Sequence, residues 1–349
     1  MKFNKKFSIG GRLISTDSPT FVIAEAGVNH GGDMKIAKKL IDLAVEAKVD
    51  AVKFQTFKAD QLILTDIQKA PYQKDTTDAS ESQYDMLKKL EVSQDQNLEL
   101  RQYCIDRDII FLTTPFNEES LDELDSLDLP AYKVSSTDTT NIPFLKKIAQ
   151  KGRPIFLSTG MSYLSEVRLA LEAIYEYNKD VVLLQCTANY PINDDEANLA
   201  VMRTYNDNFD ILLGYSDHSE GIGAAPFAVP MGAKVVEKHF TLNKSDIGPD
   251  HAASLSPKQL IDFVNTIRRV DEYMGSSIKE PSSSEFENRK SLQKCLVART
   301  DIKKGFIFNE DNIIAKRTGG IGISPIDFKI IVGKKSSRNF KKNEVISFD

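Results

Sequence analysis

The sequence predicts an α/β protein in which a closed (β/α)₈ barrel is followed by a small β-rich C-terminal module. Eight short apolar runs alternate with longer segments of helical spacing or with loops that lead to them. The 349 residues suit a barrel of about 250 residues plus an appendage. An open doubly wound sheet that binds a dinucleotide would be expected to carry a GxGxxG turn, and the sequence contains none.

The predicted strands share near-continuous apolar and β-branched residues, which is typical of strands buried on both faces. They are residues 21–27, 51–57, 109–116, 131–136, 154–160, 181–187, 211–218 and 233–240. Segments such as MKIAKKLIDLAVEAK and YLSEVRLALEAIYEYN supply helices between them. The eighth helix is predicted in SPKQLIDFVNTIRRVDEYMG, because Ser256 can serve as N-cap and Pro257 suits the first helical position.

Composition divides the chain into a barrel at 1–280, a polar Ser-rich linker at 281–290 and a module at 291–349. The module has 12 Lys and Arg against 6 Asp and Glu, a charge of +6, which leaves −11 for the rest of a chain whose total is −5. A basic module beside an acidic barrel indicates an anionic ligand or an acidic partner surface. Nucleic acid is disfavoured, because the module lacks aromatic-basic interleaving and any recognised binding motif.

The sequence also predicts a cytosolic location. No stretch approaches the roughly 20 apolar residues of a membrane span. The basic first residues are not followed by an apolar block of signal-peptide length. Three widely spaced cysteines, Cys104, Cys186 and Cys295, indicate ordinary reduced thiols.

All four histidines, His30, His218, His239 and His251, fall at or just beyond the C-terminal end of a predicted strand. That end of a (β/α)₈ barrel carries the catalytic groups. His218 and His239 close neighbouring strands, so they predict a divalent-metal site whose shell is completed by water or substrate oxygens.

Other polar residues at the predicted strand ends are Glu25, Lys53, Gln55, Thr114, Lys133, Ser136 and Ser158. Two lysines with several hydroxyls are suited to a ligand that bears both phosphate and carboxylate. Glu25 could act there as an acid, a base or a hydrogen-bond partner.

With these residues the sequence resembles the sialic acid synthase family, which includes N-acetylneuraminate, legionaminate and pseudaminate synthases. The matching blocks are IAEAGVNHGGD, VKFQTFKAD, TTPF, YKVSS, LSTGM, QCTANYP, GYSDHSEG, VEKHFTL, GPDHAASL, ARTDIKKG and AKRTGGIGISP. They span nearly the whole chain. The resemblance implies a barrel with a C-terminal antifreeze-like (SAF) domain, in a homodimer where each such domain covers the partner's active site.

The resemblance also implies that phosphoenolpyruvate is condensed with an acetamido sugar aldehyde and water, giving a nonulosonate and phosphate. The implied cofactor is a divalent metal on His218 and His239: Mn²⁺ first, with Mg²⁺ or Co²⁺ as alternatives. The implied phosphoenolpyruvate site comprises Lys53, Thr114, Lys133, Ser136, Ser158 and Ser216. The implied sugar contacts are Gln55, Tyr190 and Asp250, with Glu25 near the reacting carbons and Arg317 supplied by the partner chain.

Two positions depart from the family pattern. Thr318 stands where many relatives have proline, and Ala188 where some have asparagine. The GPDHAASL block resembles neuraminate and legionaminate synthases more than pseudaminate synthases. The resemblance therefore implies N-acetylneuraminate synthesis from N-acetylmannosamine, with legionaminate synthesis from 2,4-diacetamido-2,4,6-trideoxymannose as the alternative.

Two further hypotheses come from other classes. One is a metal-dependent aldolase or isomerase on the same barrel that does not use phosphoenolpyruvate. The other makes the C-terminal module an ice-binding domain, against which its many lysines and arginines argue, because a flat and weakly charged face would be expected.

Overall fold

The computed structural model describes residues 1–78 and 80–347. The chain forms two compact units, Met1–Gly275 and Ser276–Asp349. The segment predicted as a linker carries much of helix α12 (Glu285–Leu292). Acidic residues in the first turn of α12 and Arg289 and Lys290 in its last turn complement the helix dipole.

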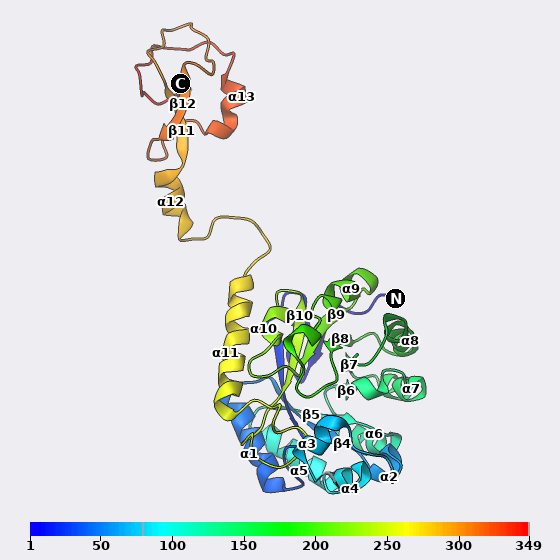
Figure 1. Ribbon diagram of the computed structural model, residues 1–349. Helices are drawn as coiled ribbons and strands as arrows, with labels where there is room; N and C mark the ends of the chain where they lie inside the picture. Colours follow the sequence, from blue (N-terminus) through cyan, green and yellow to red (C-terminus); the bar gives the residue numbers. More distant parts are fainter. Residues whose placement is uncertain (79, 348–349) are drawn as a thin grey trace. The chain divides into compact units, whose positions relative to one another are not determined.

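The first unit is the predicted (β/α)₈ barrel (Figure 1). Its parallel strands are β3 (Phe21–Gly27), β4 (Ala51–Thr56), β5 (Ile110–Pro115), β6 (Tyr132–Val134), β7 (Ile155–Ser158), β8 (Val181–Cys186), β9 (Leu212–Asp217) and β10 (Ala233–His239). They are hydrogen-bonded in the order β5-β4-β3-β10-β9-β8-β7-β6, and β5 and β6 also lie next to each other. All eight predicted strands are confirmed, and their ends lie within two residues of the predicted ones.

Helices follow the strands in turn and surround the sheet (Figure 1). They are α1 (Met34–Glu46), α5 (Gln94–Asp106), α6 (Glu118–Asp125), α7 (Ile142–Gln150), α8 (Leu164–Tyr175), α9 (Val201–Asn208), α10 (Ala225–Ala228) and α11 (Pro257–Met274). The predicted start of α11 is confirmed. Ser256 N donates to Gln259 Oε1 at 2.9 Å while Ser256 Oγ accepts from Gln259 N, a capping box followed by Pro257.

The inward side chains of the strands change from apolar to polar along the barrel axis. In β3 the inward sequence is Phe21, Ile23 and then Glu25; in β4 it is Ala51 and then Lys53. The apolar members form a buried layer inside the N-terminal half of the barrel. The outward side chains pack against the helices in a second, larger core. The polar ends of the strands therefore rest on a packed floor.

A β-hairpin that was not among the predicted elements covers this apolar layer. Strands β1 (Lys6–Ile9) and β2 (Arg12–Ser15) pair antiparallel around Gly10 and Gly11, which both have positive φ. Ile9 and Ile14 are fully buried in the inner layer. The hairpin thus closes the N-terminal end of the barrel.

Three short helices lie between β4 and α5: α2 (Ala59–Leu62), α3 (Pro71–Thr76) and α4 (Gln83–Lys88). Lys69, which is buried, anchors this insertion. Its Nζ donates to Thr77 Oγ1 at 2.9 Å and to the Asp78 carbonyl at 2.8 Å, and lies 3.0 Å from Glu81 Oε2.

The second unit is the predicted β-rich module. Strands β11 (Lys294–Ala298) and β12 (Ile313–Arg317) pair antiparallel, followed by η3 (Pro325–Asp327) and α13 (Phe328–Ile331). Its own small core includes Leu296, Phe308 and Phe340. Across the described residues of both units, no helix is both long and apolar enough to cross a membrane.

Candidate active site

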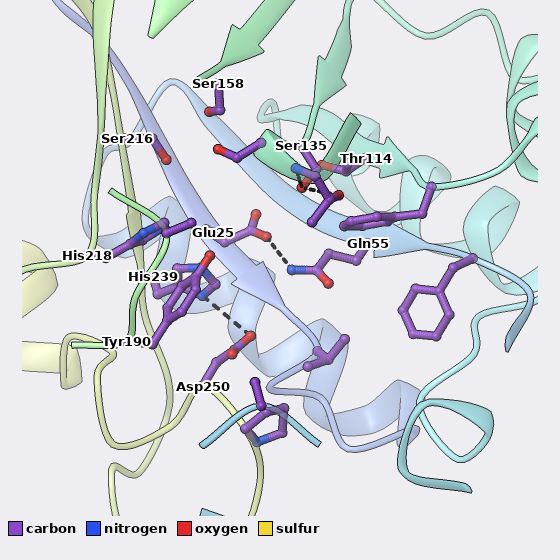
Figure 2. Close-up of a pocket in the computed structure, with 18 of the residues that line it drawn as sticks. Glu25, Gln55, Thr114, Ser135, Ser158, Tyr190, Ser216, His218, His239 and Asp250 are labelled. Carbon is purple, nitrogen blue, oxygen red and sulfur yellow. Dashed lines mark hydrogen bonds and ion pairs between the residues drawn. The ribbon is translucent and has the colours of Figure 1, made fainter. Parts of the chain in front are cut away.

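A cavity of about 490 Å³ lies at the C-terminal ends of the barrel strands. Every strand contributes to its lining, directly or through the residues that follow it. Twelve predicted site residues line it together: Glu25, Lys53, Gln55, Thr114, Lys133, Ser136, Ser158, Tyr190, Ser216, His218, His239 and Asp250. Figure 2 shows most of them converging on one space.

Two lysines and two carboxylates alternate on the floor of the cavity. Lys53 Nζ lies 2.7 Å from Glu25 Oε2 and 3.8 Å from Glu237 Oε1. Lys133 Nζ lies 3.5 Å from the same Glu237 oxygen. All four side chains are almost completely buried, and their formal charges cancel when all are ionised.

Burial changes the protonation of this cluster. It raises the pKa of the Glu25 carboxyl to about 7, although the Lys53 ammonium acts in the opposite direction. Burial also lowers the pKa of Lys133, partly offset by Glu237. For Lys53 burial is outweighed by the carboxylates of Glu237 and Glu25, which raise its pKa. Near neutral pH the Glu25 carboxyl therefore samples both protonation states, while Lys53 remains a cation.

Hydroxyl and amide groups surround the lysines. Thr114 Oγ1 accepts from Lys53 Nζ at 3.0 Å, and Ser136 Oγ accepts from the Gly160 amide at 2.9 Å. Ser158 Oγ is buried without a hydrogen-bond partner among the described residues. An unsatisfied buried hydroxyl is costly. An anion that accepts a hydrogen bond from Ser158 would remove this cost.

The two predicted metal ligands lie together beside this cluster (Figure 2). The ring centroids of His218 and His239 are 5.6 Å apart, and the Tyr190 ring lies 4.0 Å from His218 and 5.4 Å from His239. His218 Nδ1 is 2.7 Å from the Thr187 carbonyl. This contact fixes the proton on Nδ1 and leaves Nε2 as the nitrogen with a lone pair.

The donors present fit a divalent metal. His239 Nδ1 is buried and has no hydrogen-bond partner within residues 1–78 and 80–347. Burial, reinforced by the ammonium groups of Lys53, Lys238 and Lys133, holds the pKa of His239 well below its ordinary value, so the ring is neutral. Among the described residues, no three His, Cys, Asp or Glu side chains form a ligand group. Other ligands would therefore come from water or substrate, as open catalytic sites require.

The four histidines beyond the strand ends divide into two groups: His218 and His239 line the cavity, and the other two do not. Neither His30 nor His251 lines the cavity. His30 Nδ1 accepts from the Gly32 amide at 2.9 Å, and burial lowers the pKa of the ring to about 4. His251 Nδ1 lies 2.7 Å from Thr241 Oγ1. Both imidazoles hydrogen-bond within the loops that follow β3 and β10.

Gln55 and Asp250 lie on either side of a glycine that keeps this part of the cavity open. Gln55 Nε2 donates to Glu25 Oε1 at 3.0 Å, and Asp250 Oδ2 lies 3.7 Å from His239 Nδ1. Gly27 has φ +52°, and a Cβ there would be 3.3 Å from the Gln55 and Glu25 side chains and 3.4 Å from Asp250. Burial raises the pKa of Asp250 to about 6.

Arg317 is the one predicted site residue outside this cavity. It ends β12 in the second unit and is exposed to solvent. Its assignment to a site stays a prediction.

Glu237 and Cys186 are among the cavity residues that were absent from the predicted site. Glu237 holds both lysines and accepts from Ser216 Oγ at 3.2 Å. Its position two residues before His239 on a predicted strand could have indicated an inward side chain. Cys186 is one of three free, buried cysteines, and its Sγ lies 3.8 Å from His218 Nδ1.

The outer part of the cavity is largely apolar. Its wall comes mainly from the insertion between β4 and α5 and from residues beside it. The apolar lining residues are Val28, Phe57, Leu62, Ile63, Ala70, Met86, Leu87 and Phe116. Gln73 and Gln83, hydrogen-bonded to each other at 3.0 Å, are the amides in this wall. These short helices were not among the predicted elements.

Fold and site together define a (β/α)₈-barrel enzyme with a buried lysine–hydroxyl pocket beside two imidazoles. Comparison with known proteins identifies the family within this class of enzymes. Residues 40–279 match the NeuB family and residues 293–349 match the SAF domain. The chain therefore belongs to the NeuB family, and it is an enzyme of the sialic acid synthase type.

Similarity to individual proteins extends over most of the chain. The chain is 45% identical over 330 residues to N,N'-diacetyllegionaminic acid synthase of Campylobacter jejuni, covering 94% of this chain and 98% of the relative. It is 35% identical over 339 residues to human N-acetylneuraminate-9-phosphate synthase, covering 96% and 94%. A crystal structure of N-acetylneuraminic acid synthetase from Leptospira borgpetersenii, in complex with citrate, has a TM-score of 0.73 at 32% identity, covering 83% and 98%.

Proposed function

We propose that, in the cytosol, the protein condenses phosphoenolpyruvate with the open-chain aldehyde of an acetamido sugar to form a nonulosonate. C3 of phosphoenolpyruvate forms a bond to the aldehyde carbon, water adds at C2, and phosphate leaves by cleavage of its C–O bond. The observation that carries this proposal is the buried set of two lysines and several hydroxyls beside two imidazoles. Such a set suits a small ligand with phosphate and carboxylate groups.

Each group of residues has a distinct role in this proposal. Lys53 and Lys133 hold the anion together with Thr114, Ser136, Ser158 and Ser216. A divalent metal held by His218 and His239, for which Mn²⁺ is the first choice, would polarise the aldehyde oxygen. Glu25, which Lys53 and Gln55 hold in place, can hold or release a proton beside the reacting carbons near neutral pH.

The apolar outer wall favours one of the two candidate sugars. In 2,4-diacetamido-2,4,6-trideoxymannose, a methyl group replaces the hydroxymethyl group of N-acetylmannosamine and an acetamido group replaces one of its hydroxyls. Leu62, Ile63 and Met86 can contact such methyl groups, whereas hydroxyls against them would lose hydrogen bonds to water. The 45% and 41% identities to two N,N'-diacetyllegionaminic acid synthases point the same way. N-acetylmannosamine is the second candidate.

Phosphate release tests the function and the sugar together. The diacetamido sugar should give kcat/KM about tenfold or more above that for N-acetylmannosamine, since one or two methyl contacts contribute about 1–3 kcal/mol. Leu62→Ser should reduce this ratio. No phosphate release with either sugar would contradict the proposal and leave the aldolase hypothesis. A preference for N-acetylmannosamine would reverse the choice of sugar only.

Replacing Lys53 or Lys133 by methionine should raise KM for phosphoenolpyruvate about ten- to a hundredfold, with a much smaller change in KM for the sugar. The loss of a charge-assisted hydrogen bond costs about 1.5–3 kcal/mol. Steady-state kinetics with each substrate varied in turn measures the split. Lys151→Met is a control, because Lys151 pairs with Asp122 and Asp125 at 2.9 and 3.1 Å and does not line the cavity. Equal weakening of both substrates would instead indicate general damage.

We also propose a homodimer in which Arg317 enters the partner's active site. The charge of +6 on residues 291–349 complements the −11 of the remainder. Exposed apolar side chains near the cavity mouth, Met161 and Tyr163, are suited to an interface. The second unit likewise exposes Ile321 and Ile326.

A further inference from the structure

A buried ion pair lies behind the two imidazoles, on the outer side of their strands. Asp217 of β9 and Lys238 of β10 are register partners. Oδ2 and Nζ are 3.1 Å apart, and the side chains are 0% and 2% exposed. Each residue directly precedes one of the histidines. Because side chains alternate along a strand, His218 and His239 face the cavity, whereas Asp217 and Lys238 are absent from its lining.

The Asp217 carboxylate fixes the loop that follows β9. Oδ1 accepts hydrogen bonds from the amide and the hydroxyl of Ser219, and Oδ2 accepts from the Ala225 amide at 3.0 Å. His218 lies between Asp217 and Ser219. Its backbone is therefore held on both sides by one buried carboxylate.

Lys238 joins the second strand to the same loop. In addition to its contact with Asp217, Nζ donates to the Ser219 carbonyl at 2.7 Å. A Cβ on Gly223 would lie 3.0 Å from both Asp217 Oδ2 and Lys238 Nζ. The cluster has little room to rearrange, and it connects the two peptides that carry the imidazoles.

Stability alone does not explain this pair. Replacing a buried ion pair by apolar residues of similar volume often leaves the stability of a protein unchanged or increases it. A metal held by only two protein ligands, by contrast, depends on their spacing to within about 0.5 Å. Outer groups that orient metal ligands typically change metal affinity about ten- to a hundredfold.

We infer that Asp217 and Lys238 are positioning residues that set the separation of His218 and His239 and thereby the affinity of the site for a divalent cation. The inference rests on the metal centre under the proposed function. The pair touches neither metal nor substrate. It acts through the backbone of the loop between β9 and α10 and through the strand β10.

The test is direct titration of the full-length protein with Mn²⁺, in which free Mn²⁺ is measured by electron paramagnetic resonance. Lys238→Met and Asp217→Asn should each weaken Mn²⁺ binding about ten- to a hundredfold in folded protein. Arg268→Met is the matched control. It breaks the contact of 2.6 Å between Arg268 Nη2 and Asp50 Oδ2, at the opposite end of the barrel, and should lower Tm without changing the Kd for Mn²⁺.

The outcomes separate a positioning role from a merely structural one. A folded Lys238→Met protein with the Kd of the wild type would overturn the inference, even with a lower Tm. If the single variants do not fold, Asp217→Asn/Lys238→Met leaves no unpaired buried charge and must still bind Mn²⁺ at least about tenfold more weakly. A wild-type protein that binds no Mn²⁺ would overturn the metal centre, and this inference with it.

Discussion

Replacing either His218 or His239 by alanine is expected to abolish turnover while the barrel stays folded. The two imidazoles supply the nitrogen atoms that would bind the metal. Because His239 Nδ1 has no hydrogen-bond partner among the described residues, removing the ring leaves no group unpaired at that nitrogen. A single remaining imidazole is a weak site for a divalent ion. Losing several kcal/mol of Lewis-acid stabilisation corresponds to about a thousandfold or more in rate.

Phosphate release, Mn²⁺ titration and circular dichroism on the same preparations measure this result. Chelation of the wild type should stop turnover, and Mn²⁺ should restore it. His30→Asn is the matched control, because it removes an imidazole from outside the cavity and an amide oxygen can still accept from the Gly32 backbone. Full activity of a metal-free wild-type preparation would rule the metal role out.

The barrel was predictable because its strands are buried on both faces. Runs such as FVIAEAG and VVLLQC consist almost entirely of apolar residues, so each strand can be located without deciding which of its faces is buried. The N-terminal hairpin was missed for the opposite reason. In β1 and β2 only the inward residues near the turn, Ile9 and Ile14, are fully buried, and four-residue strands give a weak periodic signal.

The same reasoning explains which site residues were found. Lys53, Ser216 and His239 lie within or at the end of strands, where alternation decides which side chains face inward. His30 and His251 lie in loops, where no period applies, and both hydrogen-bond locally. Asp217 and Lys238 face outward on the same two strands. Their pairing depends on the register between β9 and β10, which one strand alone does not reveal.

Glu237 was absent from the predicted site although it contacts both lysines of the cavity. Its carboxylate lies between Lys53 and Lys133, so part of the positive charge of the lysines is neutralised before any anion binds. An incoming phosphate or carboxylate must therefore compete with Glu237 and Glu25 for the lysines. Under the proposed function, the surrounding hydroxyls and the protonation of Glu25 would favour binding of the substrate.

Arg317→Ala is expected to remove most activity without preventing dimer formation, and Arg317→Lys should also lose much of it. A guanidinium offers a planar set of donors for the hydroxyl, acetamido or carboxylate oxygens of a sugar, and lysine reproduces that geometry poorly. Arg317 is exposed at the end of β12, so its removal leaves the core of the second unit intact. Sedimentation and steady-state kinetics measure the two effects separately.

Mixing two inactive parents shows which chain supplies Arg317. Arg317→Ala and His218→Ala subunits are combined under conditions of subunit exchange. If each site takes Arg317 from the partner, a mixed dimer has one site with both lesions and one with neither. Activity should then return toward about a quarter of the wild-type value at random mixing, since half the dimers are mixed and each has one intact site. If each chain supplies its own Arg317, both sites of every mixed dimer are defective. No recovery despite demonstrated exchange would exclude the assignment to the partner.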